Sequence, residues 1–86
     1  MAQLHLNIIS PEKSLFDGDI EKVTLPGTLG PFTILPHHAP IISSLKKGVI
    51  EYVAVGDNSD GGGKQTLEIE AGFIELSNDI VIVCIS

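Results

Sequence analysis

The sequence predicts a small all-β protein, and three observations indicate this fold class. Ile, Val and Leu dominate the apolar residues, and β-branched side chains favour the pleated sheet over the helix. Apolar residues recur with a period of two, and no 3.6-residue period persists over a helical length. Gly, Pro, Asn and Asp interrupt the chain often enough to separate eight or more short strands, which indicates a β-sandwich or barrel. The 86 residues suffice for one domain, expected to cover residues 1–86.

The first strand is expected over residues 3–9, where Leu4, Leu6 and Ile8 share one face. The following Ser-Pro-Glu-Lys segment breaks the strand, and residues 17–19 (Asp-Gly-Asp) predict a turn. A second strand is expected over residues 20–25. Its apolar residues fall out of strict alternation, which indicates a bulge or bend.

Further strands are expected over residues 32–35, 41–45, 49–55, 65–70, 73–76 and 80–85. Pro36 and Pro40 flank a segment that must be extended or looped. Residues 56–64 are polar and rich in glycine, which predicts a hairpin loop.

Two of the expected strands, 49–55 and 80–85, are apolar on both faces. A strand of this kind needs cover on both sides. A sandwich covers one side, so a loop or a partner subunit must cover the other. Apolar surface left over on a small chain is typical of a protein interface.

Composition and charge exclude several partners. The chain has eleven acidic residues, five Lys and no Arg, giving a net charge of −6. Because Arg is the usual ligand for phosphate and guanine, this balance argues against nucleic acid and against docking on anionic lipid through a basic patch. No signal peptide or membrane span is visible, so we expect the protein on the cytoplasmic side. The single cysteine, Cys84, excludes an internal disulfide and is interpreted as a small hydrophobic residue.

No pattern predicts a catalytic, cofactor or metal site. Adjacent strand residues such as His37 and His38 point to opposite faces, and the chain has no His-x-His, paired Cys or HExxH motif. Asp57, Asn58 and Asp60 lack the later Glu of a calcium loop, and the glycines at 61–63 are not followed by the Lys-Ser/Thr of a phosphate loop. The remaining carboxylates and serines are interpreted as solvated strand faces.

Residues 30–40, GPFTILPHHAP, resemble the signature of the ATP synthase epsilon family, which is Gly, a short apolar strand, Pro, one residue, then His-Ala-Pro. Other segments resemble family segments in the same order: residues 9–18, 23–27, 45–50, 71–76 and 78–83. Together they span essentially the whole chain.

The resemblance implies a two-sheet β-sandwich of about ten short strands that acts as a non-catalytic central-stalk subunit of an F-type proton-transporting ATP synthase. Such a subunit binds the gamma subunit on one side and the loops of the membrane c-ring at one end. It helps couple ring rotation to ATP synthesis at the cytoplasmic face of the bacterial cell membrane. It meets the membrane only through the complex, and it needs no cofactor.

The resemblance also implies site residues. The gamma-facing surface would include Ser10, His38, Ala39, Pro40 and Ser43. The turn that carries Gly30, Pro31 and Phe32, beginning at Leu29, would lie near the c-ring. The chain ends at Ser86, directly after the last strand, whereas many relatives continue into a helical hairpin. If the chain is full length, we expect inhibition by that hairpin to be absent.

Two other function classes remain open from the residues alone. A stand-alone β-sandwich module would hold a specific ligand or metal when isolated. A small enzyme would lose turnover on substitution of His37, His38 or Glu75.

Overall fold

The computed structural model describes residues 3–55 and 64–86, and it forms eight strands within these ranges. They are β1 (Leu4–Ile9), β2 (Ser14–Gly27), β3 (Gly30–Ile34), β4 (Ile41–Leu45), β5 (Gly48–Ala54), β6 (Lys64–Ile69), β7 (Gly72–Ser77) and β8 (Ile80–Ile85). No helix capable of crossing a membrane is found among the described residues.

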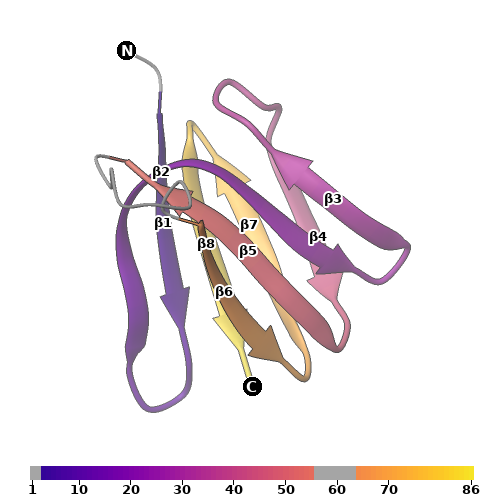
Figure 1. Cartoon of the computed structure of the whole chain (residues 1–86). Helices are drawn as coiled ribbons and strands as arrows, with labels where there is room; N and C mark the ends of the chain where they lie inside the picture. Colours follow the sequence, from indigo (N-terminus) through magenta and orange to yellow (C-terminus); the bar gives the residue numbers. More distant parts are fainter. Residues whose placement is uncertain (1–2, 56–63) are drawn as a thin grey trace.

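The long strand β2 joins two layers of sheet (Figure 1). Its first half pairs antiparallel with β1, and its second half pairs antiparallel with β3 and β5. The first layer continues from β1 through β8 and β7 to β4, while the second layer places β6 beside β5. In Figure 1, β5 and β6 lie in front of β7 and β8. This arrangement confirms the expected all-β sandwich class, with eight described strands rather than ten, and these strands form one hydrogen-bonded sheet folded into two layers.

The core lies between the layers and consists of fourteen buried Leu, Ile and Val side chains. The alternation expected at the N-terminus is clear in β1, where Leu4, Leu6 and Ile8 are fully buried and the intervening residues are half-buried. Among the described residues, no polar or charged side chain is buried. A core of this kind stabilises the fold by removing apolar surface from water, and it leaves any polar function to the outside.

The start of β2 differs from the sequence prediction, because residues 17–19 pair with β1. The predicted turn at residues 17–19 is wrong, because β2 runs straight through Asp17, Gly18 and Asp19. These residues pair with Asn7, Leu6 and His5 of β1, so their backbone groups find partners without a turn. The predicted irregularity near Ile20 is confirmed as a register shift between Ile20 and Lys22.

The connection between β2 and β3 is shorter than the gap between the strands expected over residues 20–25 and 32–35. Pro26 and Gly27 pair with Pro31 and Gly30 across β2 and β3, which leaves Thr28 and Leu29 to connect the strands. Of the polar loop expected over residues 56–64, residues 56–63 lie outside the described residues, and Lys64 begins β6.

Candidate protein interface

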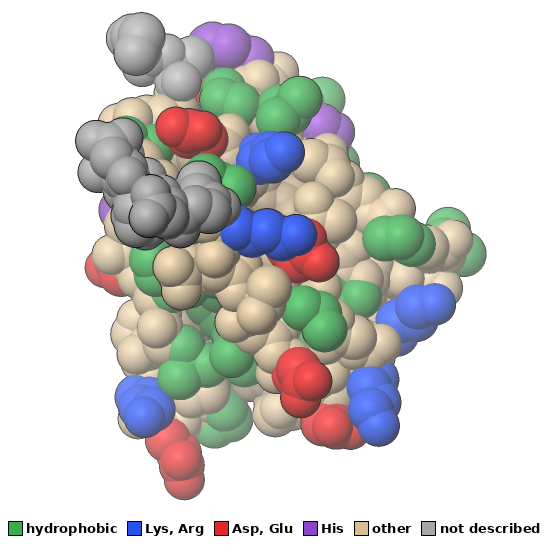
Figure 2. Space-filling view, in the orientation of Figure 1, with side chains coloured by type: hydrophobic (Ala, Val, Ile, Leu, Met, Phe, Trp, Pro, Cys, Tyr) green, Lys and Arg blue, Asp and Glu red, His purple; other side chains and the backbone are tan. Residues whose placement is uncertain are grey.

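The outer face of the second layer is largely polar. Thr24 of β2 and Thr33 of β3 share a hydroxyl hydrogen bond of 2.8 Å, and Lys64 of β6 lies 3.0 Å from the Glu51 carboxylate of β5. Figure 2 shows the side of the molecule on which β5 and β6 lie, with Lys and acidic side chains interspersed among separate hydrophobic ones. A mixed surface of this kind is typical of contact with water.

The outer face of the first layer is different. Side chains alternate along a strand, so the neighbours of buried Ile74 and Leu76 in β7, and of buried Val81 and Val83 in β8, point outward. We call the resulting outward-facing apolar residues the docking face, and they are Ile9, Ile42, Phe73, Ile80, Ile82 and Cys84.

Strand register makes the docking face continuous. One row runs from Ser44 of β4 through Phe73 and Cys84 to Ile9 of β1. The next row runs from Ile42 through Glu75 and Ile82 to Asn7, so apolar side chains outnumber polar ones in the pair of rows. Ile42 is 78% exposed and Phe73 is 50% exposed. Contiguous exposed apolar surface is characteristic of a protein–protein interface.

A groove of about 430 Å³ opens beside this face, between β3 and the region around β4. Its lining includes five of the eight candidate residues from the sequence: Gly30, Pro31, Phe32, His38 and Ser43. The structure therefore brings together residues that the family resemblance assigned to two different partners. Ile42 of the docking face also lines the groove, which makes the two surfaces continuous.

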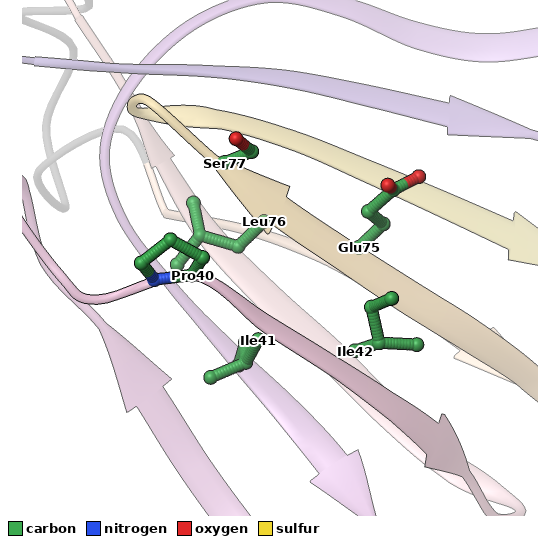
Figure 3. A pocket seen from close by; sticks show the side chains of 6 residues that line it. All are labelled: Pro40, Ile41, Ile42, Glu75, Leu76 and Ser77. Carbon is green, nitrogen blue, oxygen red and sulfur yellow. The ribbon is translucent and has the colours of Figure 1, made fainter.

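A second hollow, of about 420 Å³, lies on the other side of Ile42 (Figure 3). Pro40, a sixth candidate residue, lines it together with Ile42 and Glu75. Ile42 and Glu75 are directly opposite each other in the register of β4 and β7, and Figure 3 shows their side chains next to each other. Ile42 thus lies at the junction of the groove, the second hollow and the docking face.

The two remaining candidates occupy opposite ends of the first layer. Ala39 is exposed just before β4, and its carbonyl oxygen lies 2.7 Å from Nδ1 of His38. Ser10 follows β1, where its hydroxyl accepts a hydrogen bond from the Lys13 amide and donates one to the Lys13 carbonyl. Ile9, the neighbour of Ser10, belongs to the docking face, so Ser10 lies at the edge of that face.

The loop between β3 and β4 separates its two histidines. His38 lines the groove, whereas the amide of His37 donates a 2.7 Å hydrogen bond to the carboxylate of Asp79 in the β7–β8 turn. In the part of the chain that the structure describes, no group of three or more His, Cys, Asp or Glu is arranged to hold a metal ion.

A third histidine forms a polar cluster that the sequence did not predict. Nδ1 of His5 lies 3.0 Å from Asp19 Oδ1, and Nε2 lies 2.6 Å from Asp17 Oδ1. The hydrogen bonds to Asp19 and then Asp17 raise the pKa of His5 above its usual 6.5. Sequence reasoning missed this cluster because it placed the two aspartates in a turn instead of opposite β1.

The most exposed members of the docking face, Ile42 and Phe73, were also absent from the sequence-based candidates. A signal for them exists. In Ile41-Ile42 and in Phe73-Ile74, two adjacent large apolar residues occupy one strand, so one of each pair must face outward. In the structure, Ile42 and Phe73 are the outward-facing residues of these two pairs.

A two-layer β-sandwich with one largely polar outer face, and with adjoining exposed apolar side chains on the other, is typical of a small protein-docking domain. Residues 3–86 match the family model described as "ATP synthase, Delta/Epsilon chain, beta-sandwich domain". The chain therefore belongs to the β-sandwich family of the ATP synthase delta/epsilon chain.

Individual relatives agree with this family. The chain is 36% identical over 81 residues to the ATP synthase epsilon chain of Leptospira borgpetersenii, covering 94% of this chain but 59% of that relative. It is 33% identical to the epsilon chain of Caulobacter vibrioides, covering 88% of this chain and 81% of the relative. A chain in the Euglena gracilis mitochondrial ATP synthase structure, described as OSCP/F1/c-ring, has the same fold, with a TM-score of 0.83 at 20% identity over 99% of this chain and 51% of that chain.

Proposed function

We propose that this chain is the central-stalk epsilon subunit of an F-type proton-transporting ATP synthase. In this role it binds the gamma subunit through the docking face and the adjoining groove, and it approaches the c-ring with the turn between β2 and β3. The main support for the proposal is the group of adjoining apolar side chains on the outer face of the first layer, in a chain that belongs to the β-sandwich family of the ATP synthase delta/epsilon chain.

The exposed apolar side chains supply the free energy of docking. Burying one large aliphatic or aromatic side chain contributes about 1.5–3 kcal/mol relative to leaving it in water. A few such residues near the centre of an interface dominate its binding energy. Ile42 and Phe73 are the residues we expect in this role, because they are the most exposed apolar side chains of the docking face and lie on adjoining strands.

The position of the groove is compatible with contact to two partners. Its His38 and Ser43 side adjoins the docking face, while its Gly30, Pro31 and Phe32 side belongs to the turn proposed to approach the c-ring. Leu29, at the tip of that turn, is fully exposed. We therefore assign Ser10, His38, Ala39, Pro40 and Ser43 to the margin of the gamma interface, and Gly30 to Phe32 to the ring side.

A mechanical role needs a body that resists deformation. The strands of the two layers form one connected hydrogen-bonded path, with β2 shared between the layers. A load applied at the β2–β3 turn is carried to the docking face through backbone hydrogen bonds as well as side-chain packing. This role involves no chemistry by the chain itself, so the proposal makes the chain a non-catalytic subunit on the cytoplasmic face of the cell membrane, attached through its partners.

The test is to purify the tagged chain from membranes of its own cells and identify what accompanies it. The proposal predicts gamma in equal amount, together with the other ATP synthase subunits. Mild dissociation of the complex should leave gamma as the last protein bound. Recovery of the chain free of gamma, from cells whose ATP synthase is intact, would contradict the proposal.

A further inference from the structure

Asp79 connects three parts of the fold that are distant in sequence. Its Oδ1 accepts a 2.7 Å hydrogen bond from the backbone amide of His37, and its Oδ2 lies 3.7 Å from Nδ1 of the same residue. Its own carbonyl accepts a 2.9 Å hydrogen bond from the amide of His5 at the start of the β1–β8 pairing. The Asp79 side chain is 29% exposed, so its carboxylate is shielded from much of the solvent.

The turn that contains Asp79 does not itself require a carboxylate. Ser77 and Ile80 are paired, and the two residues between them, Asn78 and Asp79, have φ values of 52° and 61°. A two-residue hairpin loop with both φ values positive is a type I′ turn, for which Asn-Gly is a favoured sequence. This chain carries Asp in place of the favoured Gly, so the residue accepts a backbone strain that Gly would avoid.

The loop before β4, by contrast, needs an anchor. His37 has a φ of 69°, a left-handed conformation that costs a non-glycine residue about 1 kcal/mol or more. Among the described residues, the hydrogen bond to Asp79 is the one that ties residues 36–40 to a distant element. The same loop delivers His38 to the groove and Pro40 to the hollow beside Ile42.

We propose that Asp79 is a positioning residue for docking, which holds His37 in place so that His38 and Pro40 are presented at the margin of the interface. This inference rests on the proposed function, because it takes gamma as the partner that meets these residues. Asp79 itself acts through the His37–Pro40 loop and not by direct contact with the partner.

Two variants separate positioning from folding. Asp79→Asn keeps an oxygen that accepts the His37 amide, and its amide group can face the His37 ring nitrogen. Asp79→Gly removes the acceptor but creates Asn-Gly, the favoured type I′ sequence, so the hairpin is retained or strengthened. Three quantities are measured for each variant: the affinity for purified gamma, the midpoint of thermal unfolding, and the hydrogen-exchange rate of the His37 amide by NMR.

The inference predicts that Asp79→Gly weakens gamma binding about tenfold, a change of about 1.4 kcal/mol. This loss should accompany an unchanged or higher unfolding midpoint and faster exchange of the His37 amide. Asp79→Asn should match the wild type in all three measurements.

Three results would overturn it. Wild-type affinity in Asp79→Gly, while the His37 amide exchanges faster, would show that the loop conformation does not matter for docking. A lowered unfolding midpoint in Asp79→Gly would assign Asp79 a structural role instead. Failure of the wild-type chain itself to bind gamma would refute the proposed function, and the docking role of Asp79 with it.

Discussion

The imidazole of His5 lies between two carboxylates of β2, with Nε2 2.6 Å from Asp17 Oδ1 and Nδ1 3.0 Å from Asp19 Oδ1. Gln3 adds a 3.0 Å hydrogen bond from its side-chain amide to the other oxygen of Asp19. On the other side of β1, the residue of β8 that pairs with His5 is the apolar Ile80. This residue adds no charge that would change the pKa of His5. Protonation of His5 therefore links β1 to β2 through two charge-assisted hydrogen bonds.

This arrangement predicts a pH dependence with a definite sign. Because the hydrogen bonds to Asp19 and Asp17 raise the folded-state pKa of His5 above 6.5, the folded protein holds the His5 proton more tightly than the unfolded chain. The resulting stabilisation is fully present below pH 6.5 and is lost as pH rises through the folded-state pKa. Urea unfolding at a series of pH values measures it.

The matched variant for this prediction is His5→Gln, which keeps hydrogen-bonding groups but does not titrate. Its free energy of unfolding should vary less with pH across the same window than that of the wild type. In an NMR titration, Asp17→Asn combined with Asp19→Asn should lower the pKa of His5. Identical pH profiles for wild type and His5→Gln would refute the role of this cluster.

Two isoleucines on neighbouring strands should differ in how much their truncation to alanine lowers the free energy of unfolding. Ile74 of β7 is fully buried, so Ile74→Ala removes core packing and should lower the free energy of unfolding by about 2–5 kcal/mol. Ile42 of β4 is 78% exposed, so Ile42→Ala should change it by no more than about 0.5 kcal/mol. Urea denaturation of both variants gives the comparison. Equal destabilisation would mean that Ile42 belongs to the core and not to the docking face.

Gly72 has a steric reason to be glycine. A Cβ at this position would collide with the backbone carbonyl oxygen of Cys84, on the strand that pairs with β7. Relieving the collision requires the β7–β8 backbones to shift, so Gly72→Ala should destabilise the protein by about 1–3 kcal/mol. Thermal unfolding measures the change.

Gly18→Ala is the control for this substitution. The nearest atom to its Cβ would be the end of the Phe16 ring, at 3.2 Å, and a side chain can move more easily than a backbone. The destabilisation should therefore be smaller than that of Gly72→Ala. A larger loss for Gly18→Ala would contradict the steric explanation.

The sequence was sufficient to predict the fold class and most strands, because their apolar residues alternate or cluster between strong turn signals. It failed at Asp17-Gly18-Asp19, where local composition favours a turn but pairing with β1 across the sheet determines the structure. Local patterns contain no information about which distant strand supplies the partner. For the same reason, the sequence did not predict the cluster of His5 with Asp17 and Asp19, because only the pairing of β1 with β2 brings these residues together.

For the candidate site, the residues named from the family resemblance do not include the most exposed apolar residues of the docking face. Five of the eight named residues line one groove, yet Ile42 and Phe73 were not among them. Whether an apolar strand residue faces the core or solvent depends on the register of the whole layer. The sequence could show that one of Ile41 and Ile42 must face outward, but the structure was needed to show which.

The most direct test of the account is a titration of purified gamma with three forms of this chain: wild type, Ile42→Ser and Val49→Ser. Ile42 and Val49 are both exposed aliphatic residues, on β4 of the first layer and β5 of the second layer respectively. Docking through the first layer predicts a one-to-one complex for the wild type, at least tenfold weaker binding for Ile42→Ser, and wild-type affinity for Val49→Ser. Equal affinity for all three forms, or a loss confined to Val49→Ser, would contradict the assignment of the docking face.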